Sequence, residues 1–172
     1  MKTVHKVEKA EDLNDLKVLT NGIIGELCWN ASLTYPEVPE LHIGARIPNE
    51  LELLKDKDHG AWIILCWAST WKIVSPTETL MTSEHKLKEI KQGLQAIQDT
   101  HVVAFEPQYP GLGLIVTFSN GNQLILIPKD DDDVESDQDE TEVDDRNYYW
   151  ELFTPLHFTI EAGPGNKWAQ FV

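Results

Sequence analysis

Short apolar segments of strand length, separated by turn residues, recur along most of the chain. Residues 61–67 form a continuous apolar segment, whereas residues 41–45, 112–118 and 123–127 alternate between apolar and polar side chains. Tryptophan and β-branched residues are frequent in these segments, which favours strands over buried helices. The Asn120-Gly121 pair between two such segments is typical of a hairpin, because both central residues of the favoured turn need positive φ. Further strands are expected at 23–29, 71–74, 101–105, 148–153, 156–160 and 168–172.

Two segments have helical spacing instead. Residues 8–19 place Leu13, Leu16 and Leu19 three residues apart, and residues 84–98 place Leu87, Ile90, Leu94 and Ile97 on one face of an amphipathic helix. Thr82 or Ser83 can cap the second helix. We therefore expect an α+β fold, predominantly antiparallel β, in a single domain over residues 1–172.

The two halves of the chain resemble each other. Residues 41–54 align with residues 114–127 without a gap, and Trp62 aligns with Trp150. Each half has a strand, an Asn-containing turn, a second strand, a charged loop and a tryptophan-led hairpin. This order predicts two similar β-meander halves, with candidate repeats at 19–76 and 94–172, linked by one amphipathic helix. The alternative is that any two β-meanders share alternation and turn residues.

The net charge of −15 is concentrated in one tract. Residues 130–145 hold eleven acids and no base, and without them 14 basic residues face 18 acids, a net charge of −4. Such a tract repels nucleic acid and anionic membranes and attracts basic proteins or cations. We expect it to form a disordered loop at a hairpin tip, where added length is tolerated. It contains no glycine, so it is not an EF-hand loop.

The tract and the aromatic residues that follow it are the candidate partner-binding site. Aromatic side chains beside acids suit a protein interface, whereas Trp150 is expected in the core. The alternative interpretation of the tract is a solvated loop without a partner. The candidate residues are Asp130, Asp131, Asp132, Asp133, Glu135, Asp137, Asp139, Glu140, Tyr148 and Tyr149.

No motif for catalysis, cofactor binding or metal binding is found. The six histidines lack ligand spacing, and Gly111-Leu112-Gly113 does not open a helix as a phosphate-binding loop would. Cys28 and Cys66 lie in apolar segments and are expected to be buried reduced thiols. The N-terminus has no secretory signal pattern, and no apolar segment has membrane-spanning length, so we expect a cytoplasmic protein that is not an enzyme.

Residues 19–172 resemble in pattern a known class of small bacterial domains. The segments Phe118–Leu124, Trp150–Pro155 and Ala162–Trp168 are similar to those of immunity proteins encoded beside polymorphic or contact-dependent toxins. The resemblance implies a cytoplasmic inhibitor that binds a cognate toxin domain. It transfers no functional residue, and the acidic tract is not part of the shared pattern.

Two functions follow from these observations. The leading hypothesis is an immunity protein that neutralises a basic toxin domain such as a nuclease, since an acidic inhibitor gains association rate from electrostatic steering. The alternative is a small-molecule or carbohydrate-binding module that uses a tryptophan-rich sheet. Neither hypothesis involves nucleic acid or membrane as a partner, and neither specifies an oligomeric state.

Deletion of residues 130–145 tests the role of the tract. We expect the melting temperature to stay unchanged or to rise, because eleven like charges repel one another. Association with a basic partner should become slower and less dependent on salt, as stopped-flow measurements at several ionic strengths would show. A variant that unfolds would contradict this interpretation.

Overall fold

The computed structural model describes residues 1–34, 37–68, 70–128 and 148–172. Strands make up 47% of the structure and all their pairings are antiparallel, which confirms the predicted α+β, predominantly antiparallel β class. No helix among these residues is both long enough and apolar enough to cross a membrane.

The described residues form twelve strands, two short α-helices and four 3₁₀ turns. The strands are β1 (Lys2–Lys6), β2 (Leu27–Thr34), β3 (Val38–Ile47), β4 (His59–Leu65), β5 (Thr70–Val74), β6 (Thr79–Thr82), β7 (Thr100–Pro107), β8 (Leu114–Phe118), β9 (Gln123–Ile127), β10 (Trp150–Phe153), β11 (Thr159–Gly163) and β12 (Lys167–Phe171). The helices are α1 (Asn14–Thr20) and α2 (Leu87–Gly93), and the 3₁₀ turns are η1 (Ala10–Leu13), η2 (Asn21–Ile23), η3 (Glu52–Leu54) and η4 (Leu94–Ala96).

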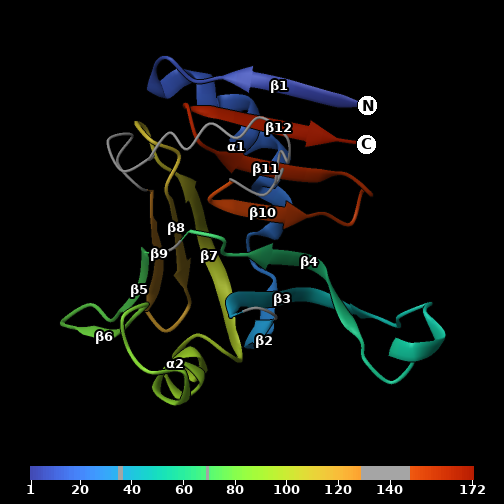
Figure 1. The fold of residues 1–172 in the computed structure, drawn as a ribbon, viewed down its shortest axis with the longest axis vertical. Coiled ribbons are helices and arrows are strands. Elements are labelled where there is room, and N and C mark those ends of the chain that lie inside the picture. Colours follow the sequence, from blue (N-terminus) through green and yellow to red (C-terminus); the bar gives the residue numbers. More distant parts are fainter. Residues whose placement is uncertain (35–36, 69, 129–147) are drawn as a thin grey trace, which may run out of the picture.

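All strands join one sheet, in the order β1-β12-β11-β10-β4-β3-β2-β7-β8-β9-β5-β6. The junction between β2 and β7 is narrow, because only Leu27 with His101 and Cys28 with Thr100 are in register there. Figure 1 shows the strands from β1 to β3 running across the view and β7, β8 and β9 running along it. The sheet therefore consists of a first strand group (β1, β12, β11, β10, β4, β3, β2) and a second group (β7, β8, β9, β5, β6) that meet at an angle.

The inner faces of the two groups share one hydrophobic core. In β4, Trp62 and Ile64 are buried while Ile63 and Leu65 are half-exposed, so alternation sends every second side chain inward. Trp150 of β10 is fully buried, meets Phe105 of β7 edge-to-face at 5.7 Å, and donates its indole N–H to the Leu112 carbonyl over 3.0 Å. These contacts hold the first group against the second.

Most predicted elements are present, with shifted ends. The predicted helix at 84–98 is shorter, because α2 spans Leu87–Gly93 and passes into η4, although Ile90, Leu94 and Ile97 are buried as expected. The strand expected at 23–29 begins only at Leu27, since η2 occupies Asn21–Ile23. The edge strands β1 and β6 were not expected from the sequence, because short, mostly exposed strands carry little hydrophobic pattern.

The predicted match of residues 41–54 with 114–127 is wrong at its second strand. Residues 123–127 form β9, whereas Glu52–Leu54 form η3, held by local hydrogen bonds such as Leu54 N–H to the Leu51 carbonyl at 2.8 Å. The paired positions Leu126 and Leu53 are 2% and 98% exposed. Residues 51–54 precede β4, which begins only at His59, and they pair with no strand among the described residues. Alternation alone therefore does not make them a strand.

The topology suggests other counterparts between the halves. A short helix precedes each of the meanders β2-β3-β4 and β7-β8-β9, and the strand after each meander pairs with the other one: β5 lies against β9 and β10 against β4. If the halves share an origin, Trp150 of β10 corresponds to Trp71 of β5, not to Trp62. The duplication itself remains a hypothesis.

Two leucine substitutions distinguish the alignment from the topology. Leu126→Ala should lower the free energy of unfolding by about 2–5 kcal/mol, because it opens a cavity in the core. Leu53→Ala should change it by less than about 0.5 kcal/mol, because Leu53 is 98% exposed. Urea denaturation of both variants measures the difference, and equal losses would contradict the position of η3.

Candidate functional site

One face of the first strand group is only half-buried and carries acidic side chains in a line. The register aligns Ser32, Glu40, Leu65, Glu151, Glu161, Ala169 and Val4 across seven strands, from β2 to β1. Residues in register point to the same face, so Glu40, Glu151 and Glu161 belong to one row, which we call the acidic row. The opposite face bears the core residues Leu41, Ile64 and Leu152. The acidic row therefore lies on the outer face of the sheet.

Glu151 and Glu161 form the central pair of this row. They lie directly opposite each other on β10 and β11, an arrangement that is unfavourable for like charges. Glu151 is only 8% exposed, and burial raises the pKa of its carboxyl, with the charge of Glu161 raising it further. The indole N–H of Trp67 donates to Glu151 Oε2 over 3.2 Å and opposes that shift. Lys2 Nζ lies 3.8 Å from Glu161 Oε2.

Two aromatic rings lie beside the central pair of the acidic row. Trp67 and Tyr148 meet edge-to-face with their centroids 6.2 Å apart. Tyr148 is held by close backbone packing, because a Cβ at Gly163 would lie 2.4 Å from the Tyr148 Cα. The hollow beside Tyr148 has a volume of about 320 Å³, and its lining combines Glu161 with the two lysines Lys2 and Lys167. A partner at the acidic row would thus meet both carboxylates and aromatic surface.

Glu40, at the far end of the row, is bound to His42. The backbone N–H of Gly60 donates to His42 Nδ1 over 3.0 Å, so Nε2 carries the proton that His42 donates to Glu40 Oε1. This hydrogen bond is the main cause of the lowered pKa of Glu40. Both ring nitrogens of His42 are engaged and the residue is 8% exposed. His42 therefore positions Glu40 and offers no free nitrogen for acid–base catalysis.

Trp29 and Arg46 extend this end of the face. The Trp29 ring lies 5.3 Å from His42, the Arg46 guanidinium lies 4.3 Å above Trp29, and the Trp29 indole N–H donates to the Gly44 carbonyl over 3.0 Å. Trp29 and Trp67 are partly exposed, whereas Trp62, Trp71, Trp150 and Trp168 are buried. The hollow of about 400 Å³ lined by Trp67 and Trp71 exposes mainly Trp67, since Trp71 is 4% exposed.

The candidates predicted from the sequence fall into three groups. Tyr148 lies at the acidic row. Tyr149 packs against the core, and its backbone N–H donates to the Ala162 carbonyl over 2.7 Å. Asp130, Asp131, Asp132, Asp133, Glu135, Asp137, Asp139 and Glu140 lie outside the described residues.

Five residues of this face were not predicted from the sequence: Glu40, His42, Glu151, Glu161 and Trp67. One signal was present in β10, where Glu151 stands between the core residues Trp150 and Leu152, so that alternation places Glu151 outward. No sequence pattern indicated that the three acids lie together, because their strands are far apart in the chain and become neighbours only in the folded sheet.

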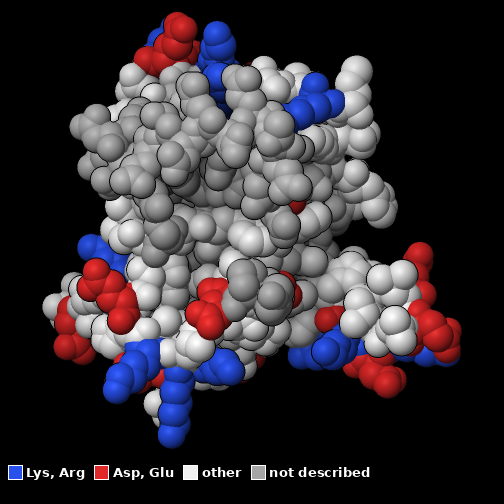
Figure 2. All heavy atoms as spheres, in the orientation of Figure 1, with Lys and Arg blue, Asp and Glu red and all other residues white. Residues whose placement is uncertain are grey.

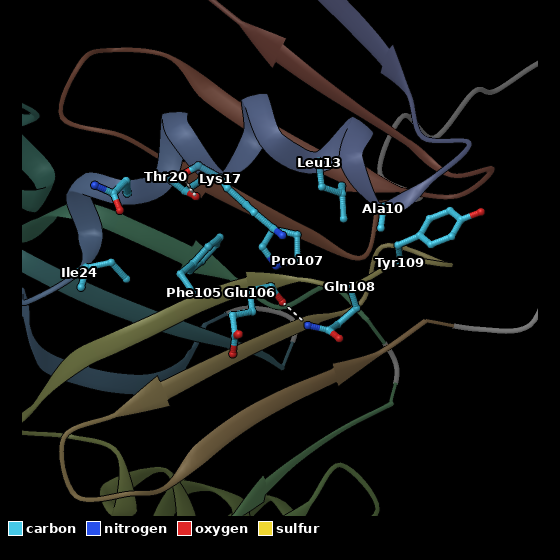
Figure 3. Close-up of a pocket in the computed structure, with 11 residues that line it drawn as sticks. Ala10, Leu13, Lys17, Thr20, Ile24, Phe105, Glu106, Pro107, Gln108 and Tyr109 are labelled. Atoms are coloured by element: carbon cyan, nitrogen blue, oxygen red, sulfur yellow. Dashed lines mark hydrogen bonds between the residues drawn. The ribbon is translucent and has the colours of Figure 1, made fainter.

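A second cavity lies between α1 and β7 and has a volume of about 380 Å³. Figure 3 shows the Lys17 side chain reaching from α1 toward β7, with Leu13 pointing into the same space from the helical side and Phe105 from the strand. Neighbouring polar groups are already engaged: the Gln108 amide donates to the Glu106 carbonyl over 2.8 Å, and the Tyr109 hydroxyl donates to the Glu8 carbonyl over 2.6 Å. Two of the polar side chains that line this cavity are therefore already bound to backbone carbonyls.

Other chemistry has little support in the described ranges. They contain no group of three or more His, Cys, Asp or Glu side chains placed to hold a metal ion. Cys28 and Cys66 are buried and unpaired, as the sequence predicts. Burial raises the pKa of the Cys28 thiol to about 12, and burial raises that of Cys66 as well. Neither thiol is therefore a nucleophile at neutral pH.

Comparison with protein-family models, with curated proteins and with solved structures finds no match to this chain.

The buried carboxyl of Glu151 makes stability depend on pH. A carboxyl whose pKa is raised by folding stabilises the fold below its unfolded pKa, and this contribution is lost as the pH rises through the raised value. Glu151→Gln should thus unfold with a higher free energy than the natural chain at pH 7, and the difference should vanish near pH 4, the range of an ordinary glutamate.

Chemical denaturation across this pH range measures the effect. The control is Glu84→Gln, which makes the same substitution at an exposed glutamate. A difference that grows on acidification would contradict the assigned environment of Glu151.

Proposed function

We propose that the chain binds a basic protein partner on the outer face of its first strand group, as an immunity-type inhibitor of a toxin domain. The observation that carries the proposal is the acidic row, where Glu40, Glu151 and Glu161 lie on one half-buried face beside Trp67 and Tyr148. Partly desolvated carboxylates next to aromatic rings suit the recognition of lysine and arginine side chains.

The distribution of charge along the chain supports the same partner. The eleven acids of residues 130–145 end three residues before Tyr148, so the chain joins its most acidic segment to the acidic row. The described body also carries a basic end, where the lysines of α2 gather (Figure 2). A basic partner is attracted to the acidic row and repelled by α2, which orients its approach.

The proposed inhibitor covers its target without any chemical step. Toxin domains that cut nucleic acid need a basic cleft to hold phosphates, and an acidic face competes for that cleft. The resemblance of the segments at 118–124, 150–155 and 162–168 to immunity proteins points to the same class. The proposed function is binding of a basic toxin domain, with a nuclease as the leading candidate.

A selection experiment tests this function. Bacteria that express the intact chain are challenged with a library of toxin domains, and survivors should carry basic domains that bind the purified chain more weakly as salt is raised. A library in which only acidic domains are neutralised, or none, would count against the proposal.

Charge substitutions locate the interface on a recovered toxin domain. Glu161→Gln should weaken binding by roughly 3- to 10-fold, the effect of losing an interfacial charge interaction of about 1 kcal/mol. Glu84→Gln removes the same charge beside α2 and should change the affinity by less than about 2-fold. Calorimetric titration compares the two, and equal losses would place the partner elsewhere.

A further inference from the structure

Part of strand β4 has an open edge. β10 pairs only with Ile63, Ile64 and Leu65 of β4 and ends at Phe153, opposite Ile63. β4 begins four residues earlier, at His59, and its first residues pair with β3 alone among the described strands. The sheet thus has a notch beside residues 59–62, in line with β10.

A cleft in the molecular surface lies at the notch. A cleft of about 550 Å³ is lined by His59, Gly60, Ala61 and Ile63 of β4 on one side and by Phe153, Thr154 and His157 on another. Ile47–Glu50, where β3 leaves the sheet, close the third side. Figure 1 shows the β3–β4 arm and the β10–β11 turn projecting from the same side of the molecule. The open edge therefore forms the wall of a cleft large enough for a peptide segment.

The β10–β11 turn keeps the notch open. Thr154 bonds to the Phe158 carbonyl through both its N–H, at 3.2 Å, and its hydroxyl, at 2.8 Å, which closes the turn on itself. Pro155 has no N–H with which to extend a ladder along β4. His157 has a φ of 61°, a left-handed conformation that costs a non-glycine residue about 1–2 kcal/mol. The turn that leads the chain away from β4 thus contains a strained residue, His157.

The surroundings of the notch are apolar and acidic. Two large exposed apolar side chains, Ile47 and Phe153, line the cleft. The arm between β3 and β4 carries four acids and two lysines, of which Lys55 is paired with Glu52 at 2.6 Å. Figure 2 shows acidic side chains at this arm.

The notch is also continuous with the acidic row. Ile63 pairs with Phe153 at the edge of the notch. Two residues further along the strands, Leu65 pairs with Glu151 on the same face of the sheet. A segment that enters the notch would therefore lie beside the row that the proposed function uses.

We propose that β4 residues 59–62 accept an extended segment of the basic partner as an added antiparallel strand that continues the line of β10. Backbone hydrogen bonds to the β4 edge supply affinity, as in other cases of strand addition. Apolar side chains of the segment pack on Phe153 and Ile63, and a lysine or arginine faces Glu50. This inference rests on the proposed function and identifies the partner element as a cationic, apolar strand.

Nuclear magnetic resonance on the intact, ¹⁵N-labelled chain tests the inference with a defined probe. The probe is a blocked hexapeptide of alternating lysine and valine, and its matched control has the same side chains but N-methylated valines, which cannot donate backbone hydrogen bonds. The first peptide should shift the amide resonances of residues 59–63 and 153–159. The N-methylated peptide should bind at least about 10-fold more weakly, the loss of some 1.4 kcal/mol of hydrogen bonding.

A pair of charge reversals separates local contact from long-range attraction. Glu50→Lys lies at the cleft, and Glu84→Lys makes the same charge change at an exposed position before α2. We expect Glu50→Lys to weaken the hexapeptide by about 5-fold and Glu84→Lys by less than about 2-fold. Equal effects would overturn the contact with Glu50.

The outcomes also separate this inference from the proposed function. Absence of shifts at residues 59–63 with millimolar hexapeptide, or equal binding of the N-methylated peptide, overturns strand addition. Shifts confined to the residues around Glu151 and Glu161 overturn the notch but keep the acidic row as the binding surface. Preference for a glutamate–valine hexapeptide overturns both proposals.

Discussion

The pairing of β10 with β4 is the contact on which the rest of the architecture depends. β10 follows the second meander in the chain, but it forms its ladder with β4 of the first meander, while β5 makes the reciprocal pairing with β9. Each meander is thus completed by a strand from the other half, so neither half is a separate folding unit. Trp150, at the start of β10, then packs against Phe105 of β7 and joins the two inner faces.

Four residues of β10 contribute to three parts of the molecule. Trp150 and Leu152 point into the core and are fully buried. Glu151 points outward into the acidic row, and Phe153 ends the ladder at the edge of the notch. Since alternate side chains of a strand lie on opposite faces, a shift of one residue would turn Glu151 into the hydrophobic core and Trp150 onto the outer face. The fold and the proposed binding surface therefore depend on the same register.

The outer face of the first strand group carries neighbouring acidic side chains. Two carboxylates in direct cross-strand contact weaken the sheet, and the structure tolerates them with a tryptophan N–H on Glu151 and a lysine near Glu161. The proposed basic partner would place further positive charge beside these carboxylates.

Local patterns in the sequence predicted much of the fold. The Asn120-Gly121 hairpin, the alternation of β8 and β9 and the buried face of Ile90, Leu94 and Ile97 were all recognisable, because turn chemistry and periodicity are properties of neighbouring residues. The expected turn with positive φ at both central residues is wrong, because only Gly121 of the two has a positive φ, of 85°. The same reasoning failed at Leu53, where alternation continues without a strand to pair with. Edge strands such as β1 escaped because they bury too little to leave a pattern.

The sequence by itself determined the β-rich class, the concentration of charge at residues 130–145 and the buried, unreactive cysteines. Only the tertiary structure decided which strands pair. That pairing brought Glu40, Glu151 and Glu161 into one row and left residues 59–62 of β4 paired with β3 alone among the described strands. The physical reason is that ladder hydrogen bonds join backbone groups that every residue has. Partner choice is therefore set by the packing of the whole core and not by any local motif.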